Sequence, residues 1–232
     1  RKYMEEIYDK GKIPNLTGGT GFYIQAVLYG IEFKEEKDNS VCRNRLESLA
    51  NEKGALWLHE CLRELDPVSA AAIHPNNVKR VIRALEYYDR TGEKISAHNE
   101  EQRKKDSPYN FCYFVLNSDR ALLYERINKR VDKMMEEGLV EEVRALLEKG
   151  LTTDMVSMQG LGYKEIAGYL KGEYSLEQAV FDIKKETRHF AKRQITWFKR
   201  EKEVIWILKE QYEREEDILN ALLIPMKEKG IV

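Results

Sequence analysis

The glycine-rich turn formed by Gly18, Gly19, Thr20 and Gly21 is the part of the sequence best suited to hold an anion. An apolar run, residues 13–17, precedes it and an apolar-periodic segment, residues 22–30, follows, so we expect a strand, a turn and a helix. Such a turn directs backbone N–H groups and the positive end of a helix at one point, where phosphates bind. No Lys-Ser or Lys-Thr follows the glycines as in a Walker loop. An ordinary connection between a strand and a helix therefore also fits.

Two groups of basic residues could bind a polyanion. Between residues 182 and 202, on a long helix expected over residues 175–200, eight Lys or Arg stand against three acids. In a chain with a net charge of only −1, this excess indicates a phosphate or RNA surface, although a solvated helix face is the simpler interpretation. Lys79, Arg80 and Arg83 form the second group, and their spacing places Arg83 on the same helix face as Lys79 or Arg80. Arginine there could grip phosphate bidentately.

Composition excludes several classes of protein. The chain has 232 residues, 34% of them charged, and a mean hydropathy of −0.61, which predicts a soluble globular protein of one large or two small domains. No apolar stretch approaches the roughly 18 residues of a membrane span. Cys42, Cys61 and Cys112 form no C-x-x-C pair and the four histidines show no ligand spacing, so we expect a reduced, cytoplasmic protein without a structural metal. The sequence begins inside a helical pattern without a signal peptide, which indicates the later part of a longer protein.

The elements that must position these residues alternate between strands and helices. A continuous apolar run at residues 109–116 predicts a strand covered on both faces, and residues 203–208 predict a last strand. Residues 40–107 show only helical periodicity, with Asn76 or Asn77 as a helix cap and Gly92 as a stop. We therefore expect an α/β core at residues 1–34 and 109–232, with a helical domain at residues 35–108 inserted into it.

The long helix near the end of the chain has the clearest pattern. Ser175 and Gln178 form an S-x-x-Q capping box at its start. Its apolar positions recur at helical spacing and predict one buried stripe. The stripe consists of Leu176, Ala179, Val180, Ile183, Thr187, Phe190, Ala191, Ile195 and Phe198.

Five motifs, in order and in register, carry a family resemblance: GGTGFY, HPNNVKRVIRALEYYDRTGEKIS, SDRALLYERINKRVDKMMEEGLVEEV, GLGYKEI and ETRHFAKRQITWFKR. Over residues 13–207 the chain resembles the bacterial tRNA dimethylallyltransferases, also called tRNA isopentenylpyrophosphate transferases. The resemblance implies a P-loop NTPase-like core with a parallel sheet and an inserted all-helical, tRNA-binding domain. It also implies a prenyltransferase that moves a dimethylallyl group from dimethylallyl diphosphate to the exocyclic amine of the adenosine 3′-adjacent to the anticodon, with Mg²⁺.

The same resemblance assigns the site residues. Thr20 and Lys164 would be catalytic, with the Thr20 hydroxyl near the oxygen that bridges the prenyl carbon and phosphorus, and Gly18 and Gly19 beside the diphosphate. Charge develops on that oxygen as diphosphate leaves, so a fixed donor there helps most in the transition state. Lys164 stands where many relatives carry arginine. The adenine would be extruded from its stack. The implied tRNA-binding residues are Arg43, Lys79, Arg80, Arg83, Gln159, Gly160, Gly162, Tyr163, Lys192, Arg193 and Gln194.

The sequence also departs from the family pattern. It lacks the Walker-type loop and the aspartate of a D-S-x-Q motif that serves as general base, so the chain as printed is expected to be inactive. The expected partners are the tRNA anticodon stem-loop and dimethylallyl diphosphate, with no membrane and no metal-ligating side chain assigned, and the chain is expected to be a monomer. Two alternatives stay open: a nucleotide kinase that uses the same turn, and a noncatalytic RNA-binding module.

Overall fold

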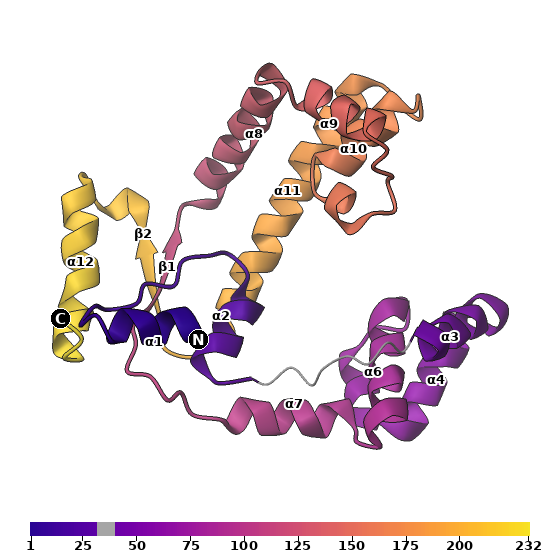
Figure 1. The fold of residues 1–232 in the computed structure, drawn as a ribbon, viewed down its shortest axis with the longest axis horizontal. Coiled ribbons are helices and arrows are strands. Elements are labelled where there is room, and N and C mark those ends of the chain that lie inside the picture. The colour runs from indigo at the N-terminus through magenta and orange to yellow at the C-terminus, as the bar shows by residue number, and fades with distance from the viewer. Residues whose placement is uncertain (32–39) are drawn as a thin grey trace. The chain divides into compact units, whose positions relative to one another are not determined.

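The computed structural model describes residues 1–31 and 40–232 (Figure 1). These form two compact units. We call Arg1 with residues 22–109 the helical unit, and residues 2–21 with 110–232 the mixed unit. The expected boundary near residue 34 lies outside the described residues, so the division into 1–34, 35–108 and 109–232 stays a prediction. Among the described helices, none combines the length and the apolar character that a membrane crossing requires.

All elements described between residues 40 and 104 are helices, which pack around one apolar core. In α6 (Val78–Thr91), the backbone N–H of Gly92, in the left-handed region at φ 70°, donates to the carbonyl of Tyr88, and Asn77 stands at the N-cap, as predicted. The most deeply buried core residues are Leu58, Leu62 and Val81. The helices of this unit are α2 (Gly21–Leu28), which begins in the mixed unit, α3 (Ser40–Lys53), α4 (Ala55–Leu65), α5 (Pro67–Ala72), α6 (Val78–Thr91) and α7 (Ile95–Lys104).

A buried carboxylate, Asp66, joins three of these helices. It lies between α4 and α5 and is 3% exposed. It accepts hydrogen bonds from the backbone N–H groups of Ser69 and Ser96, both at 3.0 Å, and from their hydroxyls, both at 2.7 Å. Burial alone would raise the pKa of Asp66, but the hydrogen bonds from both serines outweigh it and lower the pKa below its ordinary value. Asp66 therefore ties the start of α7 to the junction of α4 and α5 as an ion.

The mixed unit contains the strands that the structure describes. They pair in parallel, with Tyr113 opposite Val204 and Asn117 opposite Leu208, and Figure 1 shows them side by side. A parallel pair needs a long crossover, which the helices between the two strands provide. The elements of this unit are α1 (Lys2–Tyr8), β1 (Tyr113–Asn117), α8 (Arg120–Glu136), α9 (Leu139–Glu148), the 3-10 helix η1 (Val156–Gln159), α10 (Tyr163–Leu170), α11 (Leu176–Phe198), β2 (Val204–Leu208), η2 (Lys209–Gln211) and α12 (Glu215–Glu228).

The long helix α11 follows its prediction only in part. The Ser175 hydroxyl caps it by accepting from the N–H of Gln178 at 3.2 Å, which confirms the predicted start. Ala179 and Ile183 are buried in a core shared with α8, α9 and α10. The expected stripe does not continue evenly, since Phe190 is 43% exposed. The helices that cover the first half of α11 do not extend over its second half, where Phe198 is buried beside Tyr113.

The strand predicted at residues 13–17 is not formed. These residues lie outside any helix or strand, and Ile13 and Leu16 are 48% and 49% exposed. An apolar, extended sequence becomes a strand only where a neighbouring strand satisfies its backbone groups. Among the described residues, β1 and β2 pair with each other and not with this segment.

Candidate functional site

The glycine turn is fastened to the second half of α11. The side-chain amide of Gln194 donates a hydrogen bond to the backbone oxygen of Gly19 at 2.8 Å. A Cβ atom on Gly19 would lie 2.5 Å from that amide nitrogen, and a Cβ on Gly21 would overlap the indole ring of Trp197. The close approach of the Trp197 ring therefore requires glycine at position 21, whereas a side chain at position 19 would displace the Gln194 amide. In Figure 1 the indigo segment that precedes α2 runs to this end of the orange helix α11.

Thr20 lies between the two fastened glycines. Its residue is exposed, and α2 begins directly after it in the chain. Gly18, on the other side of the turn, has open space where a Cβ would stand. α11 thus holds the backbone of the turn, while Thr20, in the middle of the turn, is open to a ligand. This is the arrangement that a hydroxyl donor for a bound anion requires.

A second contact steadies Trp197 itself. Its indole N–H donates to the carboxylate of Glu201, which follows four residues later, beyond the end of α11. Burial raises the pKa of Glu201, and the hydrogen bond from Trp197 opposes that rise without cancelling it. Trp197 and Glu201 were not singled out in the sequence. The spacing of three residues between Gln194 and Trp197 is a helical pattern that could have indicated a shared face, whereas Glu201 lies beyond the end of α11.

The GLGYKE motif is ordered by a buried carboxylate, Glu165, which is 6% exposed. It accepts from the backbone N–H of Gly162 at 2.9 Å, where the backbone has φ 97°, and its Oε1 lies 3.4 Å from the Lys164 ammonium. Glu165 was missed as a site residue, although a G-x-x-E sequence at a helix start resembles a capping box. Gln159 and Tyr163 are also held, by hydrogen bonds to the Thr153 carbonyl and the Glu142 carboxylate.

Thr20 and Lys164 belong to the same unit but are attached to different halves of α11. The core around α10 includes Ile183, whereas the glycine turn is bound at Gln194. These two anchor points are eleven residues apart along the helix, about 16 Å at 1.5 Å per residue. The expectation that both residues contact one diphosphate therefore stays a prediction.

The basic residues of α11 divide into two sets. In the first half, Lys184 is paired with Asp132 at 2.5 Å and Arg188 donates to Asn128 at 2.7 Å, so both connect α11 to α8. In the second half, Lys192 and Arg193 are exposed and precede Gln194 in the sequence. Part of the charge excess noted in the sequence is thus paired inside the mixed unit, and part of it faces solvent.

In the helical unit the predicted basic residues lie on one side of α6. Lys79, Arg80 and Arg83 are exposed, whereas Val81 and Ile82 on the other side are buried. Arg43 of α3 is held by an ion pair with Glu86 of α6 at 2.8 Å. An amphipathic helix with an exposed cationic face fits the phosphate-binding surface expected for this unit.

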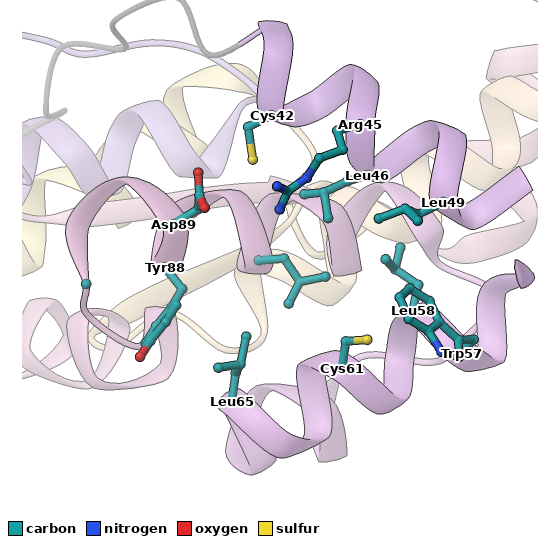
Figure 2. Close-up of a pocket in the computed structure, with 12 residues that line it drawn as sticks. Cys42, Arg45, Leu46, Leu49, Trp57, Leu58, Cys61, Leu65, Tyr88 and Asp89 are labelled. Atoms are coloured by element: carbon teal, nitrogen blue, oxygen red, sulfur yellow. The ribbon is translucent and has the colours of Figure 1, made fainter. Parts of the chain in front are cut away.

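A cavity of about 500 Å³ lies between α3, α4 and α6 (Figure 2). Leu46, Trp57 and Leu58 line it, together with Cys42 and Cys61. Burial is the main cause that raises the pKa of both thiols, so they carry little thiolate at neutral pH. None of the residues expected to bind substrate lines this cavity, which distinguishes it from the site on α11. The three cysteines are free, as predicted.

Comparisons with known proteins cover both units. The family model described as IPP transferase matches residues 1–201. A tRNA dimethylallyltransferase from Lachnoclostridium phytofermentans is 56% identical over this whole chain and 74% of its own length. The solved full-length tRNA isopentenylpyrophosphate transferase from Bacillus halodurans is similar with a TM-score of 0.65 and 38% identity, over 99% of this chain and 72% of that one. A solved eukaryotic dimethylallyltransferase acting on tRNA gives a TM-score of 0.70 and 26% identity, over 97% and 58%. The chain therefore belongs to the IPP transferase family, a family of tRNA-prenylating enzymes.

Proposed function

We propose that the protein transfers a dimethylallyl group from dimethylallyl diphosphate to the exocyclic amine of the adenosine 3′-adjacent to a tRNA anticodon. The amine nitrogen forms a bond to C1 of the prenyl group while the bond from C1 to the bridging oxygen breaks, and the amine proton passes to a base. The observation that carries this proposal is the glycine turn on α11, because it joins two family motifs and leaves Thr20 open to a ligand. The parallel strands β1 and β2 support a P-loop-like core, into which the helical unit would be inserted.

Thr20 would act on the leaving group. Its hydroxyl donates a hydrogen bond to the bridging oxygen, where negative charge grows as the C1–O bond breaks. A donor that is already in place costs no reorganisation at that moment, so it lowers the barrier more than it strengthens substrate binding. Gly18 and Gly19 would approach the diphosphate through their backbone N–H groups, since neither carries a side chain that would keep the anion away.

Lys164 would neutralise diphosphate charge, with Gln159, Gly160, Gly162 and Tyr163 nearer the adenine. Glu165 supports this role of Lys164, because it orders the loop through its hydrogen bond to Gly162 and holds the Lys164 ammonium beside its carboxylate. Replacing Lys164 by alanine should then raise the KM for dimethylallyl diphosphate and leave tRNA affinity unchanged. If the alanine variant lost only tRNA affinity, Lys164 would be a contact to RNA and not to the diphosphate.

The described residues contain no group of three or more His, Cys, Asp or Glu side chains that could hold a metal ion. Mg²⁺ commonly binds through substrate phosphates and few protein carboxylates. When bound with the diphosphate substrate, Mg²⁺ would neutralise charge on the leaving group. We assign it no ligand in this chain.

The exposed cations of α6, with Arg43, would bind the phosphates of the anticodon stem-loop, and Lys192 and Arg193 would bind RNA near the reacting base. Replacing both Arg80 and Arg83 by alanine should weaken tRNA binding about 10- to 100-fold at physiological salt, because two phosphate contacts and their counterion release are lost. The slope of log affinity against log salt should fall by about 2. Fluorescence anisotropy with a labelled stem-loop over a salt series measures both.

Arg63→Ala is the matched control for the Arg80 and Arg83 variant. Arg63 is an exposed arginine of the same unit, paired with Glu60 and outside the proposed RNA surface. It should leave the affinity and the salt slope unchanged. An unchanged slope in the double variant, or an equal loss of dimethylallyl diphosphate binding, would contradict the assignment of α6 to tRNA.

The reaction itself is tested by direct transfer. The protein is expressed from its complete natural reading frame and mixed with labelled dimethylallyl diphosphate, Mg²⁺ and an anticodon stem-loop. Label should enter RNA that carries adenosine at the 3′-adjacent position and should not enter the same RNA with guanosine there. If the RNA binds but no label is transferred, the function is RNA binding without prenylation.

A further inference from the structure

We propose that Gln194 and Trp197 are positioning residues for the reaction: they fix the glycine turn on α11 and thereby fix the place of Thr20. This inference rests on the proposed function, because it assigns a purpose to the contacts beneath Thr20. It gives Gln194 a different role from the tRNA contact expected from the sequence. The side-chain amide of Gln194 is already directed at the backbone oxygen of Gly19.

The two residues act on the turn at separate points. Gln194 binds the Gly19 oxygen at 2.8 Å, and the edge of the Trp197 indole ring packs against Gly21. A spacing of three residues places both on one face of α11. The result is one polar contact and one apolar contact, on either side of Thr20.

The turn needs such support because little else in its own segment holds it. The residues before it form no strand, and Gly18 and Gly19 are exposed. Glycine samples more backbone conformations than any other residue, so an unsupported turn of this composition would spread the Thr20 hydroxyl over many positions. A misplacement of about 1 Å at a catalytic group can cost about 10²-fold in rate. Contacts on both sides of Thr20 prevent that loss.

Gly21→Ala tests the apolar contact. Gly21 is the first residue of α2 and its φ lies outside the left-handed region, so alanine is compatible with the backbone there. The added methyl group overlaps the Trp197 ring and should displace the turn. We expect kcat for prenyl transfer to fall about 10²-fold while tRNA affinity stays within about twofold. Adding Trp197→Ala removes the overlap but also the apolar contact, so the double variant should stay well below the wild-type rate and should not exceed Trp197→Ala alone.

Gln194→Glu tests the polar contact with almost no change of shape, since a carboxylate cannot donate to the Gly19 oxygen. Hydrogen exchange should become at least about tenfold faster in the peptide covering residues 16–22, and kcat should fall without a change in tRNA affinity. Gln178→Ala is the control, because Gln178 is exposed on the same helix and bonds Asp182 instead. It should alter neither exchange nor turnover.

The outcomes separate this inference from the proposed function. If the wild-type protein transfers no prenyl group, the proposed function fails, while exchange of the turn in Gln194→Glu still reports whether α11 holds it. If the wild-type protein is active and Gln194→Glu loses tRNA affinity instead of turn protection, Gln194 is an RNA contact and the inference is wrong. Full activity of Gly21→Ala, or full activity of the double variant, would overturn the role of Trp197.

Discussion

Thr20→Val is expected to slow dimethylallyl transfer by about 10²- to 10³-fold, with the affinities for tRNA and dimethylallyl diphosphate little changed. Valine keeps the shape of threonine and removes the hydroxyl. The donor is needed mainly when charge develops on the bridging oxygen, so its loss should appear in kcat rather than in binding. Single-turnover measurement of labelled prenyl transfer, with substrates near saturation, isolates that step.

Two variants make the Thr20 result specific. Thr20→Ser restores a hydroxyl at the same Cβ and should retain turnover within about tenfold of the wild type, since the extra methyl group of threonine only restricts the rotamer. Thr17→Val removes a neighbouring exposed hydroxyl, which lies 3.4 Å from Asn15 Oδ1, and should leave the rate unchanged. Wild-type turnover in Thr20→Val would show that the hydroxyl takes no part in the reaction.

Asp66→Asn is expected to lower the free energy of unfolding of the helical unit by about 3 kcal/mol. The carboxylate accepts four hydrogen bonds from Ser69 and Ser96. An asparagine amide offers one oxygen and turns its NH₂ group toward the other donors, which leaves buried donors unpaired. Urea unfolding, followed by circular dichroism and compared with Asp106→Asn at an exposed site, measures the difference.

The Asp66 carboxylate also predicts how the free energy of unfolding depends on pH. The pKa of Asp66 is lowered from its ordinary value of 3.8, so the unfolded chain binds more protons than the folded one around that pH. The stability that ionised Asp66 contributes is fully present above its unfolded pKa and is lost as the pH falls through its lower folded pKa. Between about pH 5 and pH 2, Asp66→Asn should therefore lose less stability than the wild type. Parallel acid profiles of the two would contradict this assignment.

The sequence by itself determined the features that depend on residues close together in the chain. Asp119 caps α8 through the N–H of Ala121 at 2.8 Å, Ser175 caps α11, and Gly92 ends α6, because caps and stops act within one helical turn. The strand β1 and the helices of residues 40–104 follow in the same way from local periodicity. The five motifs also identified the family, since they carry their signal in residue type and order.

Periodicity gave no information about which distant segments meet. The stripe on α11 predicted burial at Phe190, but burial needs a covering element, and periodicity does not say where a cover ends. The apolar run at residues 13–17 likewise predicted a strand from local pattern alone. Among the described residues no strand pairs with it. Asp66 and Ser96 are 30 residues apart in the sequence, so their bonds left no local pattern.

The site shows this division most clearly. Residue types marked the glycine turn and the motif around Gln194 separately as places for an anion or RNA. Only the tertiary structure showed that Gln194 reaches Gly19 across 175 residues of sequence and that Trp197 fills the space a Cβ on Gly21 would need. Short-range spacing reports contacts within one helical turn, whereas contacts of this kind arise from the packing of the whole unit.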